Sequence, residues 1–231
     1  MTNGIHLLFG SDGNRRYARK MGITFEESYQ RGAVKTLDVV RWACCSPYDI
    51  DEISVSVIND YNFERDKEDL QVIAKALVDG VELIVDCAKE CDFEARVVGD
   101  SNKLGVCYPG VVDAIAKIQN ETDGGSKKVN FLVVYDTNQE YQNAVDRCKR
   151  KMLSLTWNNV MTNWSIPQVD LAFRPAQVQG FNRSSEYFPG MKNAFFYSFS
   201  NFFVDITKED FDEMMRLYKE GEHRFKDQNL R

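Results

Sequence analysis

Short apolar runs alternate with helical patterns along this chain, and that alternation constrains the fold more than any other feature. The strand-like runs are Ile5–Phe9, Glu52–Ile58, Glu94–Val98, Val129–Tyr135 and Val169–Phe173, with a weaker one at Phe202–Ile206. The helical patterns are Glu26–Cys45, Asp66–Cys91, Val111–Gln119, Gln139–Leu155 and Asp210–Lys219. Strands that alternate with helices are typical of crossover units, so we expect an α/β fold with a mostly parallel central sheet flanked by helices.

Length and charge limit the architecture and the partners. The chain has 231 residues, 43% of them hydrophobic, with no repeat, low-complexity tract or long linker. We therefore expect a single domain over residues 1–231. The formal net charge is −6, which argues against a broad nucleic-acid-binding surface, so no nucleic-acid partner is expected.

The cysteine pattern bears on metal binding and on the cellular compartment. None of the six cysteines forms a Cys-x-x-Cys pair and only two histidines are present, which argues against a zinc site. The four-residue spacing of Cys87 and Cys91 favours one buried helix face over a ligand pair. The N-terminus has no signal-peptide pattern and no apolar run approaches the roughly 20 residues of a membrane span. We expect a cytoplasmic protein with free thiols and no transmembrane segment.

The segment after the first strand carries the clearest chemical pattern. Asp12, Gly13 and Asn14 are followed directly by Arg15 and Arg16. A carboxylate suits a divalent metal, a helix start offers free N–H groups, and guanidinium groups match phosphate oxygens. These residues favour a magnesium–diphosphate site. An Asp-Gly turn before a surface helix with solvated arginines is an equally good interpretation of this segment alone.

Other polar residues also follow strands. The carboxyl ends of parallel strands meet at one edge of the sheet, where ligands bind. We therefore expect Asp12, the segment Asn62–Arg65, Tyr135 and Arg174 to come together there.

The loop after the fifth strand suggests a second anion site. Arg174, Arg183 and Ser185 could hold a second diphosphate through bidentate and hydroxyl contacts. The alternative is that Arg174 pairs with a core acid and Arg183 lies on the surface.

Several short motifs, in this order, resemble those of the cis-prenyltransferases, the undecaprenyl-diphosphate-synthase-like family. They are His6 with Asp12-Gly13-Asn14, Arg16-Tyr17-Ala18, Asn62-Phe63-Glu64-Arg65, Arg96–Asp100, Asn130 with Tyr135, Asp170-Leu171 with Arg174, Arg183-x-Ser185, and Phe211 through Arg224-Phe225. The resemblance covers nearly the full length. It implies the same α/β fold and a homodimer.

The resemblance also implies roles for the matching residues. Asp12 would hold Mg²⁺ on the diphosphate of an allylic substrate, and the segment Gly13 to Arg16 would cradle that diphosphate. Arg174, Arg183 and Ser185 would bind the second diphosphate. Asn62 and Arg65 would organise the reacting centre. The apolar face of residues 66–91 would line the hydrocarbon pocket, although ordinary core packing explains that face as well.

The chain departs from the family pattern at several positions. Phe25 and Tyr29 occupy the places of an arginine and a histidine, and Asn201 takes the place of a glutamate that helps to bind magnesium. Ser28-Tyr29 and Arg174-Pro175 are similar to the irregular lavandulyl- and cyclolavandulyl-diphosphate-synthase subgroup. In that context Tyr29 would place a substrate or relay a proton; it could equally be a pocket wall.

These features lead to three functional hypotheses. The first is a prenyltransferase that condenses short allylic diphosphates, two dimethylallyl diphosphate units, into an irregular or cyclised prenyl diphosphate with release of pyrophosphate. The second is a terpene cyclase on the same scaffold that uses one longer prenyl diphosphate. The third is a catalytically silent cis-prenyltransferase subunit, which the lost acids favour and the retained arginines oppose.

Overall fold

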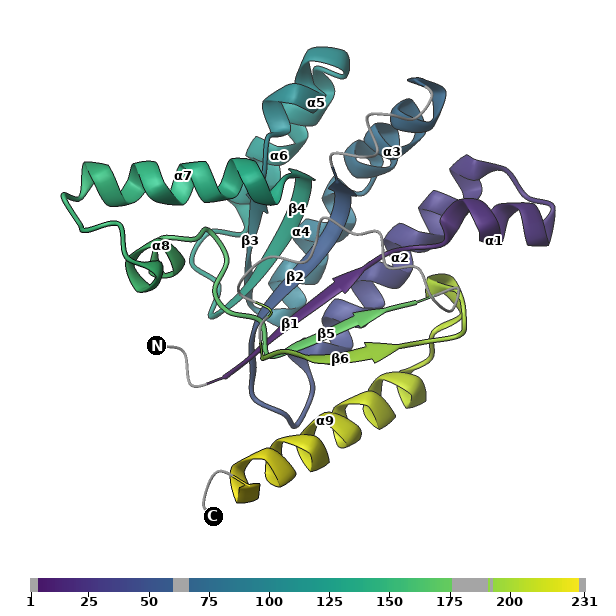
Figure 1. Cartoon of the computed structure of the whole chain (residues 1–231). Helices are drawn as coiled ribbons and strands as arrows, with labels where there is room; N and C mark the ends of the chain where they lie inside the picture. The colour runs from purple at the N-terminus through teal and green to yellow at the C-terminus, as the bar shows by residue number, and fades with distance from the viewer. Residues whose placement is uncertain (1–3, 60–66, 176–190, 192, 229–231) are drawn as a thin grey trace.

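The computed structural model describes residues 4–59, 67–175, 191 and 193–228 and contains a six-stranded sheet in the order β3-β4-β2-β1-β5-β6 (Figure 1). The strands are β1 (Ile5–Gly10), β2 (Ile50–Asn59), β3 (Phe93–Val98), β4 (Lys127–Tyr135), β5 (Leu171–Arg174) and β6 (Phe195–Ser198). Every neighbouring pair is parallel. The expected α/β fold with a mostly parallel sheet is therefore confirmed.

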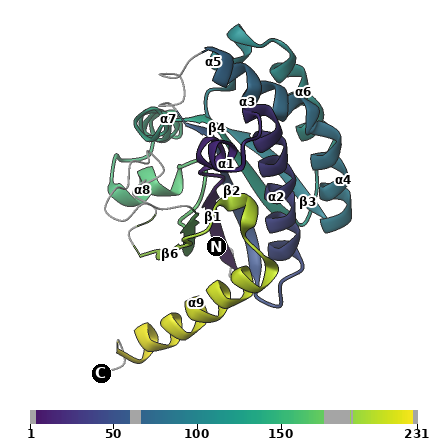
Figure 2. The same ribbon diagram turned by 90° about the vertical axis from the view of Figure 1, so that its right-hand side faces the viewer.

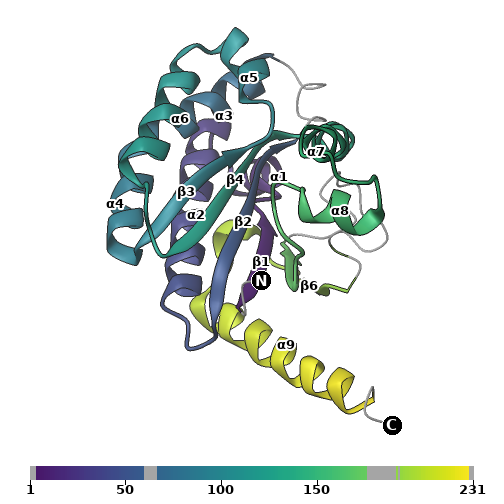
Figure 3. The same ribbon diagram turned by 90° about the vertical axis from the view of Figure 1, so that its left-hand side faces the viewer.

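Helices cover both faces of the sheet (Figures 2 and 3). The first face is covered by α2 (Phe25–Cys44), α3 (Lys67–Asp79), α4 (Val81–Cys91) and α6 (Gly110–Glu121), with α1 (Asn14–Met21) packed on α2 and α5 (Ser101–Cys107) on α6. The opposite face is covered by α7 (Thr137–Arg150) and α8 (Trp157–Thr162), while α9 (Lys208–Gln228) contacts α2 and β6. None of the described helices combines the length and apolar character needed to cross a bilayer.

Side-chain alternation along the strands divides the core into two layers. On β1, Leu7 and Phe9 face the α2 side, whereas Leu8 faces α7 and α8. The Phe9 ring stacks on Phe173 of β5 with 5.1 Å between ring centroids. Both rings are almost fully buried, so this contact holds the two strands that carry the site side by side.

Two of the predicted elements were wrong in detail, and β6 was not predicted. The helix expected over residues 66–91 is interrupted at Gly80, where α3 ends and α4 begins. The apolar residues keep the same spacing across the break, so their pattern gives no sign of it. One glycine nevertheless weakens a helix. Residues 203–205 form a short 3₁₀ helix instead of a strand, and the sixth strand is β6, whose side chains are alternately half-buried and exposed.

A buried polar network ties β1 to its neighbours on the α7 side of the sheet. The Nδ1 atom of His6 lies 3.1 Å from the carbonyl oxygen of Gln168, and its Nε2 atom lies 2.8 Å from Ser54 Oγ. A carbonyl only accepts, so Nδ1 carries the proton and Nε2 accepts from the hydroxyl. The Asn130 amide donates to Ser54 Oγ (3.2 Å) and to Glu52 Oε1 (2.6 Å). His6 is therefore a neutral structural residue.

Burial of His6 predicts a pH dependence of stability. Desolvation lowers the pKa of His6 below the ordinary 6.5, so as the pH falls through 6.5 the unfolded chain binds this proton before the folded chain does. As the pH is lowered, the free energy of unfolding should therefore fall faster in the wild type than in His6→Gln. The two slopes should differ by up to about 1.4 kcal/mol per pH unit. Urea unfolding between pH 5 and 7.5 measures both slopes. Equal slopes for wild type and His6→Gln would contradict the assignment.

Candidate active site

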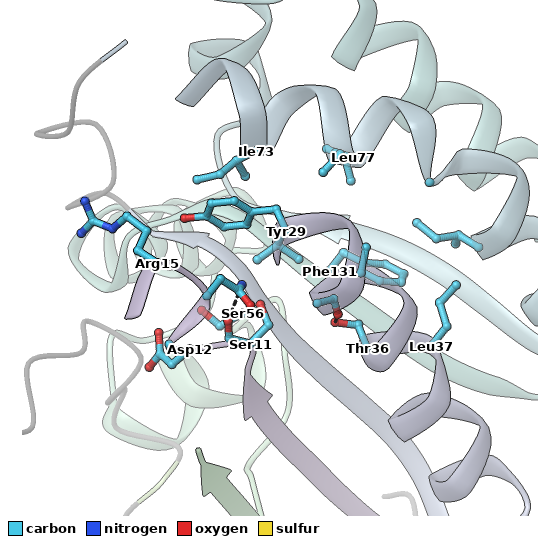
Figure 4. A pocket seen from close by; sticks show the side chains of 18 of the residues that line it. Ser11, Asp12, Arg15, Tyr29, Thr36, Leu37, Ser56, Ile73, Leu77 and Phe131 are labelled. Atoms are coloured by element: carbon cyan, nitrogen blue, oxygen red, sulfur yellow. Dashed lines mark hydrogen bonds between the residues drawn. The ribbon is translucent and has the colours of Figure 1, made fainter. Parts of the chain in front are cut away.

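A cavity of about 390 Å³ opens at the carboxyl end of β1. Gly13 adopts a positive φ of 98° and caps α1, a conformation that glycine adopts without strain. The turn sets Asp12 at the mouth of the cavity, with Ser11 and Ser56 nearby (Figure 4). The chain therefore places its Asp-Gly-Asn segment at the edge of the sheet where parallel α/β folds bind ligands.

Asp12 and Arg174, which are 162 residues apart in sequence, are in direct contact. The Arg174 Nε atom donates to Asp12 Oδ2 at 3.0 Å, and its Nη2 atom donates to the same oxygen. β1 and β5 are adjacent, so their ends bring the two side chains together as expected. The alternative that Arg174 pairs with an acid also holds in part, but that acid lies at the cavity mouth rather than in the core.

The basic residues of α1 differ in their surroundings. Arg15 forms an ion pair with the largely buried Asp69 of α3 at 3.0 Å, so it is not simply a solvated arginine. Arg16 is exposed and lines the same cavity. The Arg19 guanidinium lies 5.9 Å from the ring centre of Phe25.

Asn14 joins α1 to α2 at the back of the mouth. Its Nδ2 atom donates to the Ser11 carbonyl at 3.0 Å, and its backbone carbonyl accepts from Ser28 Oγ at 2.8 Å. The Asn14 Oδ1 atom is buried without a hydrogen-bond partner. A Cβ atom on Gly32 would lie 2.8 Å from that oxygen, so a larger residue at this position would require the Asn14 side chain to shift. No sequence pattern pointed to Gly32.

The floor of the cavity is apolar. It is lined by Leu37 of α2, Ile73 and Leu77 of α3, Ile84 of α4 and Phe131 of β4. These side chains also belong to the main core, so the cavity-lining and core interpretations of residues 66–91 are both correct. In Figure 4, Tyr29 of α2 lies between Arg15 at the mouth and Phe131 on the floor.

Tyr135 does not join this site, contrary to the expected convergence. Its hydroxyl accepts from Trp164 Nε1 at 2.8 Å, and burial raises its pKa. The residue lines a second, polar cavity at the ends of β3 and β4. Val134 just before it has a φ of 51°, an irregularity that strand periodicity does not encode. Asn62, Arg65, Arg183 and Ser185 lie outside the described residues.

The metal-binding side chains that line the cavity can be compared with the ligands that Mg²⁺ prefers. Among the described residues, Asp12 is the one carboxylate that lines the cavity, and no group of three or more metal-binding side chains occurs. Magnesium is commonly held by one or two carboxylates together with substrate phosphates. The site therefore fits a metal shared with a diphosphate, with Asp12 as its protein ligand.

Comparison with known proteins is consistent with this geometry. The chain belongs to the undecaprenyl diphosphate synthase family of prenyltransferases, whose model matches residues 11–226. It is 31% identical over 150 residues to a (2Z,6E)-farnesyl diphosphate synthase of Mycolicibacterium smegmatis, over 64% of this chain and 55% of that protein. The match thus spans about half of that relative.

Two further comparisons cover nearly the whole chain. An isoprenyl transferase of Campylobacter jejuni is 26% identical over 95% of this chain and 97% of its own length. The lavandulyl diphosphate synthase from Lavandula x intermedia, solved with dimethylallyl diphosphate, superposes with a TM-score of 0.81 at 18% identity over 94% of this chain and 95% of that one. The latter likeness establishes the shared fold.

The close approach of α1 and α2 predicts the effect of one added methyl group. Gly32→Ala should force Asn14 out of place and lower the free energy of unfolding by about 1–3 kcal/mol, the usual cost of overpacking. Urea denaturation measures it. Gly110→Ala is the matched control, because nothing lies within 4 Å of the Cβ atom that it adds. A Gly32→Ala protein as stable as the control would show that the two helices separate without cost.

Proposed function

We propose that this chain is a cis-prenyltransferase that condenses short allylic diphosphates, with dimethylallyl diphosphate as donor and acceptor, into an irregular or cyclised prenyl diphosphate and releases pyrophosphate. The observation that supports this most is the contact of Arg174 with Asp12 at the polar mouth of a cavity that Asp12, Arg15 and Arg16 line. Cationic groups beside a diphosphate stabilise it as a leaving group.

The mouth supplies the groups that the first diphosphate needs. Asp12 would hold Mg²⁺, which when bound would neutralise the charge that develops on the departing pyrophosphate. The backbone at Gly13 and the free N–H groups of α1 offer donors to phosphate oxygens. Arg15, held by Asp69, adds a fixed guanidinium. Arg174, which donates to Asp12, would bind the diphosphate of the second substrate.

The cavity floor supports a short hydrocarbon chain. An apolar cavity of about 150 Å³ takes one benzene molecule, so about 390 Å³, part of it needed for a diphosphate, suits five to ten carbons better than a long polyprenyl chain. Two of the similar proteins carry short prenyl groups in their names, farnesyl and lavandulyl. Apolar walls also exclude water from a carbocation and so favour attack by the second alkene.

Tyr29 lines this cavity at a position where the sequence departs from the pattern of the resembling family. It lies where the polar mouth meets the apolar floor. We infer that its hydroxyl holds the substrate or receives a proton at this boundary.

The homodimer that the resemblance implies also remains an expectation, which light scattering on the same preparation would test.

The first prediction for function concerns Asp12 and magnesium. Purified protein with dimethylallyl diphosphate and Mg²⁺ should release pyrophosphate, and a chelator should stop the release. Asp12→Asn should lower the rate by about 10² to 10³-fold, the usual effect of losing one electrostatic group from such a site. The exposed Asp86→Asn on α4 is the matched control and should keep the wild-type rate.

Mass spectrometry of the product separates the remaining hypotheses. A ten-carbon product that retains a diphosphate is the expected result. A hydrocarbon or alcohol formed from one longer prenyl diphosphate would replace the proposal with a terpene cyclase. Failure to bind C5 to C20 prenyl diphosphates in calorimetry, with or without Mg²⁺, would leave the silent subunit.

The second prediction tests whether the hydroxyl of Tyr29 or only its aromatic ring contributes to turnover. If the hydroxyl acts on the substrate, Tyr29→Phe should lower turnover by about 10-fold or more, and Tyr29→Ala should lower it no less. Steady-state kinetics measures both, with the exposed Tyr141→Phe as control. Full activity in Tyr29→Phe together with a defect in Tyr29→Ala would show that Tyr29 is only a wall of the pocket.

A further inference from the structure

The connection between α7 and α8 exposes an unusual set of apolar side chains. Met152 is 92% exposed, Leu153 39%, Leu155 57% and Trp157 61%; we call these four residues the apolar tip. Single exposed apolar side chains are ordinary on protein surfaces, but a contiguous group indicates an interaction site. Nothing in the proposed prenyl transfer uses these residues.

The backbone of this connection is held in place by hydrogen bonds. The Leu153 N–H donates to the Cys148 carbonyl at 2.9 Å, and the Asn159 side chain donates to the Ser154 carbonyl at 2.8 Å. Thr156 Oγ1 accepts from the Asn159 N–H at 3.3 Å and caps α8. The fold therefore presents the apolar tip outward in a defined conformation, which lowers the entropy lost when a partner covers it.

The charged residues in the segment that contains the apolar tip are all basic. Lys149, Arg150 and Lys151 precede it directly, and the sequence has no acidic residue from Arg147 through Val169. The whole chain carries a net charge of −6, so this positive segment is local. Lys149 has one acidic neighbour, Asp146, at 3.3 Å. A tryptophan and aliphatic side chains beside basic residues have the composition of surfaces that bind the interface of anionic bilayers.

The position of the apolar tip leaves the cavity mouth accessible. α7 and α8 cover the face of the sheet opposite to α2 and α3 (Figures 2 and 3), and α2 and α3 line the cavity. The connection between α7 and α8 lies at the periphery of the molecule in Figure 1. A flat partner can therefore contact it without covering Asp12.

We propose that the apolar tip docks this protein on the surface of an anionic lipid bilayer, with Trp157, Leu155 and Met152 at the depth of the headgroups and Lys149 to Lys151 on lipid phosphates. The proposal goes beyond prenyl transfer and does not depend on it. A second copy of the chain is a less favourable occupant, because a two-fold contact would bring the same three cations of both copies together.

Vesicle binding tests this directly. The protein should sediment with vesicles of phosphatidylcholine and phosphatidylglycerol, and much less with phosphatidylcholine alone or in high salt. Brominated lipid should quench Trp157 fluorescence, identified as the part of the signal that is lost in Trp157→Phe. No sedimentation with the anionic vesicles, or sedimentation without quenching of Trp157, would overturn the proposal.

Matched variants locate the contact. The double variant Leu155→Ser, Trp157→Ser should lose vesicle binding at least tenfold, whereas Val106→Ser should not, although Val106 on α5 is 85% exposed. Arg150→Ala should weaken binding about fivefold, the effect of roughly 1 kcal/mol per basic residue at an anionic surface, and Lys89→Ala should leave it unchanged. If light scattering shows instead that the double variant dissociates a dimer while vesicle binding persists, the tip is a subunit contact and the proposal fails.

Discussion

The parallel pairing of β1 with β2 on one side and β5 on the other determines where the polar groups of the site lie. Asp12 follows β1 and Arg174 ends β5, so the pairing brings a carboxylate and a guanidinium together across 162 residues of sequence. Packing of Phe9 on Phe173 holds the two strands in register beneath them. The buried network around His6 fixes the other end of β1. A change that displaced this strand would separate the two halves of the site.

The order of strands and helices could be predicted from the sequence because each is a local pattern. Residues 129–135 are almost uniformly apolar, as a strand buried on both faces must be, and β4 covers them. Elements set by weak or non-periodic signals were missed. Gly80 breaks a helix without changing its apolar period, and β6 is an edge strand whose side chains are half-buried or exposed. Hydrophobic periodicity therefore gives no clear sign of either feature.

For the site, the sequence predicted which residues lie at strand ends but not how their side chains are engaged. The positions of Asp12, Arg15 and Arg174 at one edge of the sheet follow from topology alone. Two contacts of the site depend on how α1, α2 and α3 pack: the ion pair of Arg15 with Asp69 and the approach of Gly32 to Asn14. No local pattern in the sequence predicts this packing. The expectation that Tyr135 joins this site was wrong, because the backbone is irregular at Val134 and Tyr135 lies at another cavity.

The contact between Asp12 and Arg174 has a thermodynamic consequence for any ligand of either group. In this structure the guanidinium donates to the carboxylate. A divalent cation on Asp12 would displace Arg174 and so return one positive group to the rim, where it would be available to an anion. Linkage would make such an effect mutual: an anion that occupies the arginine would raise the affinity of the aspartate for the cation by the same factor. Occupancy of either group would thereby prepare the other.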